Sequence, residues 1–260
     1  MGLRIRTNIA SVNAQRNLDQ TTRRLGEDMT KMSSGYRINK AADDAAGMAI
    51  SESLRAKSRS LQQAQRNAND GISLVQIAEG SMNEITNILI RMRELATQAA
   101  SDTIGNTERS YTNREYVQLV NEVDRIAKTT EFNGLPILQG QDAVGDESMF
   151  TLHIGAGDGV IENTDTIQIA VDTIEIDPAE TLGLGTESEI GPIEIDGDFN
   201  RDTAAEKLNV IDNALDSISS SRAYLGAQQS RLNSAISNLG TQIENVQSAR
   251  SRIRDVDFAD

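Results

Sequence analysis

Apolar residues recur every seven positions through both ends of the chain, and this constrains the fold more than any other feature. Between residues 50 and 99 two apolar registers alternate at three- and four-residue spacing, which is typical of a helix packed lengthwise against other helices. Proline, which interrupts helices, does not occur before residue 136. We therefore expect one long helix. Its first register contains Leu54, Leu61, Ala68, Val75, Met82, Leu89 and Ala96, and its second contains Ile50, Ala64, Ala78, Ile85, Met92 and Ala99, with Lys57 and Gly71 as exceptions.

The C-terminal flank keeps the same repeat more strictly, from residue 211 to residue 253. A capping-box pattern, Thr203 followed by Glu206, predicts where this helix begins. We expect it to pack antiparallel to the first long helix within the subunit, chiefly through Leu54, Leu61, Leu89, Leu225, Leu232 and Leu239. The heptad positions are Ile211, Ile218, Leu225, Leu232, Leu239, Val246 and Ile253.

Two weaker stripes predict shorter helices. One ends near Asn133-Gly134 and comprises Tyr116, Leu119, Val123 and Ile126. The other lies at the N-terminus and comprises Ile5, Ile9 and Val12, then Leu18, Leu25 and Met32. The run Ser33–Gly35 interrupts it, and small residues 41–47 form a connector before the long helix. Each stripe requires a partner helix, from the same chain or from a neighbour, to bury it.

The middle of the chain differs in charge and in period. The net charge is −14, and residues 141–200 contain fifteen acidic residues and no Lys or Arg. Alternation of apolar and polar residues around 150–154, 167–171, 174–176 and 193–195 predicts short strands and hairpins. The expected fold class is therefore mainly α: a long antiparallel coiled-coil-like helix bundle with a small β-hairpin region at its tip.

Candidate chemistry is sparse, and we expect neither an enzyme nor a cofactor or metal. The chain has no Cys and one His, His153, which the alternation places on the polar side of a strand. The run Asp196–Asp202 begins like a calcium loop, but Arg201 and Lys207 stand where glycine and glutamate are needed. The run Gly155–Gly159 lacks the lysine of a phosphate loop. Without a long basic patch or a long apolar run, we expect no nucleic acid partner and no membrane span.

One charged segment of the long helix, Arg91–Leu95, invites a functional interpretation. Leu95 lies off the centre of the apolar stripe, and an exposed leucine between charges can form an interaction surface. The alternative is a solvated helix face whose charges pair with one another.

Several runs together make the chain resemble bacterial flagellin, the subunit of the flagellar filament, in a short form without large outer domains. The resemblance covers both flanks and is carried by Arg4–Ile9 with Leu18, Lys31–Asn39 (KMSSGYRIN), Ala41–Ile50 (AADDAAGMAI), Arg93–Ala96 (RELA), Glu131–Gly134 (EFNG), and Ala249–Ile253 (ARSRI) with Asp255.

The resemblance implies a secreted, extracellular structural protein that polymerises for motility. Such a protein leaves the cell through the flagellar type III apparatus and assembles under a cap, so its partners are copies of itself and the flagellar cap, junction and export proteins. By this mapping, residues 1–42 form an N-terminal inner-tube segment. Residues 43–138 and 203–260 form a helical rod domain, and residues 139–202 form its acidic β region.

The resemblance also implies site residues. Filament assembly would use Ile5, Ile9, Val12 and Leu18. Host Toll-like receptor 5 is a potential partner, and the positions that match its binding surface are Arg91, Leu95 and Glu115, although Ile90 and Thr97 depart from the commonest pattern. Flagellins usually continue beyond the segment at Asp255 into a terminal helix, so whether the chain extends past Asp260 stays open.

Three alternatives remain at this stage. A hook–filament junction protein shares the terminal patterns and would occur as few copies per flagellum. A signalling coiled coil such as the cytoplasmic part of a chemoreceptor shares the heptads but not the acidic β region. An enzyme or calcium-binding module would have to depend on His153 or on the run Asp196–Asp202.

Overall fold

The computed structural model describes residues 8–139, 149–155, 157, 165–170, 173–177, 182–184 and 201–257. In these residues four helices carry most of the structure: α1 (Ile9–Ser34), α2 (Ala45–Ala99), α3 (Asn106–Thr129) and α5 (Arg201–Arg254). The strands pair into two antiparallel hairpins, β1 (Glu131–Phe132) with β2 (Leu135–Pro136) and β3 (Met149–His153) with β4 (Thr166–Ala170). The expected fold class, a mainly α helix bundle with a small β region, is confirmed.

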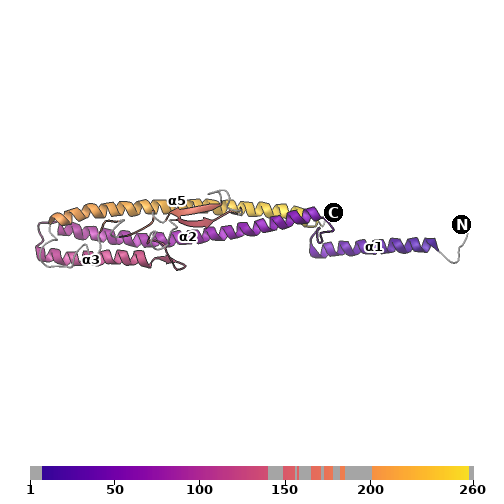
Figure 1. Cartoon of the computed structure of the whole chain (residues 1–260), viewed down its shortest axis with the longest axis horizontal. Helices are drawn as coiled ribbons and strands as arrows, with labels where there is room; N and C mark the ends of the chain where they lie inside the picture. The colour runs from indigo at the N-terminus through magenta and orange to yellow at the C-terminus, as the bar shows by residue number, and fades with distance from the viewer. Residues whose placement is uncertain are drawn as a thin grey trace. The chain divides into compact units, whose positions relative to one another are not determined.

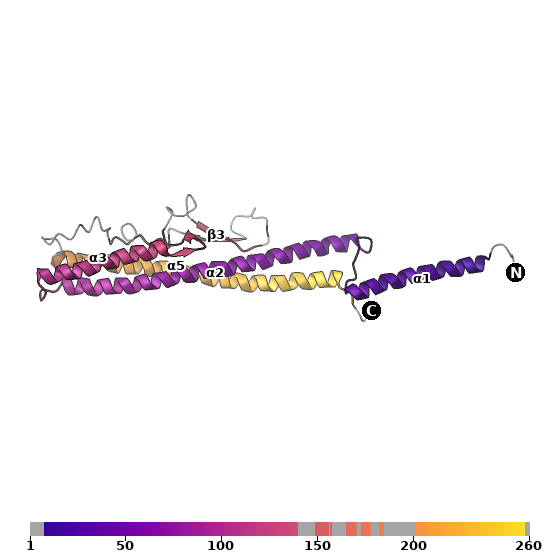
Figure 2. The same ribbon diagram turned by 90° about the horizontal axis from the view of Figure 1, so that it is seen from below.

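The chain divides into two compact units, one of residues 63–239 and one of residues 1–62 with 240–260. In the larger unit, α2 lies between α5 and α3, and α5 runs antiparallel to α2 (Figures 1 and 2). Both heptad registers of α2 point into its core from Ala64 onward, and so do the C-terminal heptad positions from Ile211 to Leu239. The long helices therefore form because each carries a continuous apolar stripe that the other covers.

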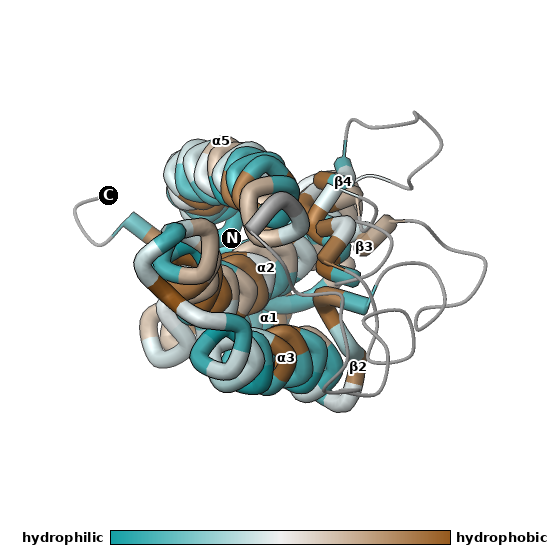
Figure 3. Tube along the Cα trace, turned by 90° about the vertical axis from the view of Figure 1, so that its left-hand side faces the viewer, coloured by the Kyte–Doolittle hydropathy of each residue, from teal (hydrophilic) through white to brown (hydrophobic). Residues whose placement is uncertain are grey.

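The hairpin of β3 and β4 lies beside α2 and α5 in this unit (Figure 3). Phe150 pairs with Ile169 and Leu152 with Ile167, and both isoleucines are buried. This packing explains the glycine at position 71 in the apolar register. A Cβ atom there would overlap Cδ1 of Leu152, so glycine leaves room on α2 for that side chain of β3.

Three local expectations are wrong in detail. Helix α3 ends at Thr129, and Asn133 and Gly134 instead form the turn of the β1–β2 hairpin, with φ values of 53° and 77°. This is the positive-φ pair that a tight hairpin turn requires. Helix α5 begins at Arg201, so Thr203 lies inside the helix and is not its N-cap.

The segment 174–176 is the third case, since it forms no strand in the described structure. Ile174 and Ile176 are nevertheless buried, and the N–H of Ile176 donates to the carbonyl oxygen of Leu138 at 2.9 Å. The hydrophobic pattern thus predicted burial correctly and secondary structure incorrectly. Val171 and residues 193–195 lie outside the described residues.

The smaller unit contains α1, the connector 35–44 and the adjoining ends of α2 and α5. Asn8 caps α1 by accepting the N–H of Ser11, and Gly35 ends it with φ 72°. The expected interruption of the N-terminal stripe at Ser33–Gly35 is therefore confirmed. Asp44 accepts the N–H of Gly47 at 2.8 Å and so caps α2, which begins at Ala45 within the expected small-residue connector.

The connector is tied to the end of α5. The guanidinium of Arg37 donates to the carbonyl oxygen of Ile253 at 2.8 Å, and its backbone N–H donates to that of Arg254 at 2.7 Å. The guanidinium of Arg254 lies 4.5 Å from the ring centroid of Tyr36 and donates to the carboxylate of Glu52 at 2.9 Å. These contacts hold the chain between α1 and α2 against the last turn of α5.

Candidate functional site

Helix α1 carries the candidate assembly residues, and none of its side chains is buried. Residues nine positions apart on a helix lie about 180° apart. Ile9 and Leu18 therefore face opposite sides, and α1 has two apolar stripes. Val12 belongs with Ile9, whereas Leu25, Met29 and Met32 belong with Leu18, and all six side chains are exposed. Ile5, the remaining candidate, lies outside the described residues.

Arg91 and Glu115, two of the candidate receptor residues, meet between α2 and α3. The guanidinium of Arg91 donates to Glu115 Oε1 through Nη2 at 2.8 Å and through Nε at 3.0 Å, and to Glu94 Oε2 at 3.0 Å. These bonds, to Glu115 first and Glu94 second, raise the pKa of Arg91 above its usual value. All three side chains remain about half exposed, so the cluster is accessible, and its ion pairs add little to stability.

Leu95 differs from the expectation, since it is not an exposed leucine. Its side chain is only 3% exposed. Leu95 lies one helical turn after Arg91 on the same face of α2, and the contact between Arg91 and Glu115 brings α3 over that face. A partner of the folded subunit would therefore reach little of the Leu95 side chain directly.

The six leucines expected to hold the helices together lie on α2 and α5. Leu61, Leu89, Leu225, Leu232 and Leu239 are buried, and Leu54 is half-buried. Arg93 belongs to the charged segment but faces the other side of α2 from Arg91. It donates to Asp212 on α5 at 2.7 Å, which adds a polar link beside the apolar contacts.

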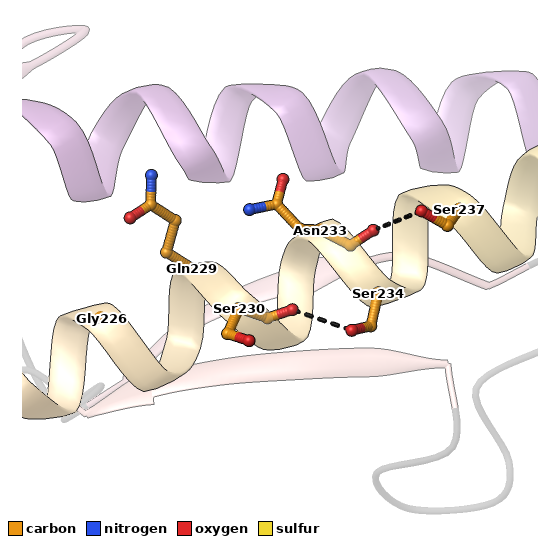
Figure 4. A pocket seen from close by; sticks show the side chains of 6 residues that line it. All are labelled: Gly226, Gln229, Ser230, Asn233, Ser234 and Ser237. Carbon is orange, nitrogen blue, oxygen red and sulfur yellow. Dashed lines mark hydrogen bonds between the residues drawn. The ribbon is translucent and has the colours of Figure 1, made fainter.

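A shallow depression on α5 in the larger unit holds no reactive group (Figure 4). Two of its three serine hydroxyls are already used within the helix: Ser234 donates to the carbonyl oxygen of Ser230, and Ser237 to that of Asn233. Gln229 and Asn233 point toward α2. The depression is lined by Gly226, Gln229, Ser230, Asn233, Ser234 and Ser237, none of which is charged.

The glycine-rich run, His153 and the calcium-like run form no binding site within the described residues. The carboxylate of Asp165 fills the space beside Gly155 and Gly157, where a phosphate would have to bind. His153 is exposed at the end of β3, and its carbonyl oxygen accepts from Asn67. Residues 196–200 of the calcium-like run lie outside the described residues. No described helix is long and apolar enough to cross a membrane.

Sequence reasoning missed one buried charge, Arg109 of α3. Its guanidinium donates to the carbonyl oxygens of Ala99 at 2.8 Å and Ser101 at 2.9 Å, and to the side chain of Asn106 at 3.0 Å. It thereby satisfies carbonyl groups at the C-terminal end of α2, where a positive charge is favoured. A lone Arg in a helix carries no signal for this role, because the role depends on the turn between the helices.

Two models of a known protein family match most of this chain. The family model for the bacterial flagellin N-terminal helical region matches residues 5–143, and that for the C-terminal helical region matches residues 208–260. The chain belongs to the bacterial flagellin family. Its members are structural subunits of the flagellar filament, so the short-form flagellin expected from the sequence is confirmed.

Individual relatives agree with the family. A flagellin of Halalkalibacterium halodurans is 41% identical over 258 residues, which cover 98% of this chain and 86% of that protein. The crystal structure of Bacillus cereus flagellin superposes with a TM-score of 0.54 at 32% identity, covering 71% of this chain and 94% of that one. A putative flagellar hook-associated protein from Vibrio parahaemolyticus superposes with a TM-score of 0.66, covering 82% of this chain and 100% of that one. Its identity is only 13%, so it shares the fold alone.

Proposed function

We propose that this flagellin assembles by burying the two apolar stripes of α1 against helices of neighbouring copies. The observation that carries the proposal is that α1 exposes Ile9, Val12, Leu18 and Leu25 while its ends are locally capped. Exposed apolar side chains at helical spacing are typical of a face that packs against another helix. Residues 1–42 would then form the inner layer of the filament.

The rest of the chain would form the outer layer. Residues 43–138 and 203–260 supply the helical domain, and the leucines of α2 and α5 hold it together within one subunit. Residues 139–202 supply the acidic β region, whose charge would face water and favour solubility. The protein would be exported by the flagellar type III apparatus, assemble under the cap beyond the junction proteins, and act outside the cell in motility.

A matched pair of substitutions on α1 tests assembly. We expect Ile9→Asn to leave the monomer folded and to abolish filaments, because an amide would replace an apolar contact between copies. Gln20→Asn introduces the same residue on the same helix without removing an apolar group, and should polymerise normally. Circular dichroism reports folding, and negative-stain electron microscopy reports filaments. Normal filaments from Ile9→Asn would refute the role of this stripe.

We also propose that Arg91 and Glu115 form part of the surface by which Toll-like receptor 5 would bind the free subunit. Both side chains are accessible and already aligned with each other. Leu95 would act from beneath, by supporting the turn that carries Arg91. In receptor reporter cells, Arg91→Ala should weaken activation by the monomer, whereas Arg125→Ala, an exposed ion-paired arginine elsewhere on α3, should not. Equal activation by both variants would exclude this surface.

The alternative role, a hook–filament junction protein, predicts a different distribution in the flagellum. Electron microscopy of flagella sheared from the source cells, with gel quantification of this chain, separates the two. A filament subunit should form the main band and decorate the whole length with a specific antibody. Labelling confined to the hook end would support the junction role instead.

A further inference from the structure

Methionine is the only sulfur-containing residue type in this chain, and the methionines that the structure describes lie in different environments. The side chains of Met29 and Met32 on α1 are 64% and 62% exposed. Met82 and Met92 in α2 are fully buried at 0%, and Met149 at the start of β3 is 44% exposed. Exposure decides which thioether sulfurs an oxidant in water reaches first.

Met29 and Met32 belong to the second apolar stripe of α1. Leu18, Leu25, Met29 and Met32 follow one another at spacings of seven, four and three residues, which places them on one side of the helix. Half of this stripe is therefore thioether. Sulfur makes a soft, adaptable apolar contact in its reduced state, but oxidation makes it polar.

We propose that Met29 and Met32 are an oxidative modification site that controls assembly. The inference rests on the proposed function, in which this stripe is buried between copies. Hydrogen peroxide is the oxidant: the sulfur lone pair attacks one peroxide oxygen, the O–O bond breaks, and a sulfur–oxygen bond forms. The hydroxide that leaves takes the proton of the new S–OH group, so each methionine yields one sulfoxide and one water.

The sulfoxide oxygen opposes assembly because burial would strip it of water. A strong acceptor placed in an apolar contact without a donor is costly. The hydroxyls of Thr21 and Thr22 flank the stripe, and that of Thr21 already donates to the carbonyl oxygen of Asn17 at 2.9 Å. The hydroxyl of Thr22 already donates to the carbonyl oxygen of Leu18 at 2.9 Å. Free subunits are therefore vulnerable to peroxide, whereas subunits already packed in a filament are shielded.

The test uses the full-length protein as monomers obtained by depolymerising filaments. Peroxide is added until peptide mass spectrometry shows sulfoxide at Met29, Met32 and Met149 but not at Met82 or Met92. Polymerisation is then measured by sedimentation. We expect the critical concentration to rise about tenfold or more, which corresponds to at least about 1.4 kcal/mol. Treatment with methionine sulfoxide reductases and a dithiol, which becomes a disulfide as water is released, should restore assembly.

Two variants locate the effect. Met29→Leu combined with Met32→Leu keeps the stripe apolar without sulfur, and should polymerise equally well before and after peroxide. Met149→Leu removes an exposed methionine outside α1, and should lose assembly on oxidation as the parent does. Preformed parent filaments should show little sulfoxide at Met29 and Met32 while Met149 oxidises.

The outcomes separate this inference from the function on which it rests. If the untreated parent forms no filaments, the proposed function fails and this inference fails with it. If untreated and fully oxidised parent polymerise alike, the inference alone is overturned. It is also overturned if the variant lacking both methionines is as sensitive to peroxide as the parent.

Discussion

Tyr116 of α3 is a polar side chain buried inside the helix bundle. It is 1% exposed, and its hydroxyl has no hydrogen-bond partner among the described residues. An unpaired buried hydroxyl has lost its hydration without compensation. We expect Tyr116→Phe to raise the free energy of unfolding by about 1 kcal/mol, measured by urea denaturation of the monomer. Tyr111→Phe, an exposed control on the same helix, should change nothing; a destabilised Tyr116→Phe would indicate a partner for the hydroxyl.

Tyr116 also makes the free energy of unfolding depend on pH in the alkaline range. Burial raises the pKa of its hydroxyl in the folded state, whereas the pKa of a tyrosine in the unfolded chain is about 10. Because the folded pKa is the higher one, the unfolded state loses its proton first as pH rises. The contribution of this group is therefore complete below about pH 10 and declines above it. Unfolding curves between about pH 8 and 11 should show a steeper loss for the parent than for Tyr116→Phe; parallel losses would contradict this assignment.

At the scale of elements, the turn between α2 and α3 depends on Arg109. Its guanidinium replaces water at two carbonyl oxygens near the end of α2. We expect Arg109→Ala to lower the free energy of unfolding by about 1.5–3 kcal/mol, since charge-assisted hydrogen bonds are lost and carbonyl groups stay buried. Arg125→Ala removes only an exposed ion pair on the same helix and should cost much less. Equal losses, measured by thermal unfolding, would argue against the capping role.

The stability of the connector between α1 and α2 depends on pH in the acidic range. Hydrogen bonds from the backbone N–H of Lys40, and next from that of Asn39, lower the pKa of the Asp43 carboxyl. Because the folded pKa is the lower one, this loop is fully stabilised above the unfolded value of about 4 and weakens as pH falls through the folded value. Amide hydrogen exchange at Asn39 and Lys40 should accelerate in acid relative to neighbouring amides. In Asp43→Asn that extra acid dependence should vanish; if it persists, another group is responsible.

At the scale of the whole molecule, we expect folding and assembly to use different apolar residues. Leu232 is fully buried between helices, so we expect Leu232→Ala to lower the free energy of unfolding by about 2–5 kcal/mol. Leu18→Ala removes an equal volume from an exposed face and should leave the monomer nearly unchanged while weakening polymerisation. Chemical denaturation of monomers and sedimentation of polymers measure the two effects. A large loss of monomer stability in Leu18→Ala would mean that the stripe already has a partner within the subunit.

The candidate surfaces were predictable to different degrees. Periodicity predicted that the N-terminal stripe needs a partner helix. That none of the α1 side chains is buried within the described subunit came only from the structure. Only the resemblance linked Arg91 with Glu115 as parts of one surface. The two residues lie 24 positions apart, and no spacing pattern indicates their contact. The exposure of Leu95 was predicted incorrectly, because a helical wheel of α2 does not show that α3 returns over that face.

What the sequence determined by itself is local. Apolar positions every seven residues, no proline before residue 136 and a glycine at position 35 dictate long helices and the end of α1, since these features act through neighbouring residues on one helix. Only the tertiary structure decided why Gly71 interrupts the register, why Arg109 is buried and why Leu95 is covered. Each depends on segments that meet after the chain has turned back, and periodicity along one helix carries no information about which side the returning segment covers.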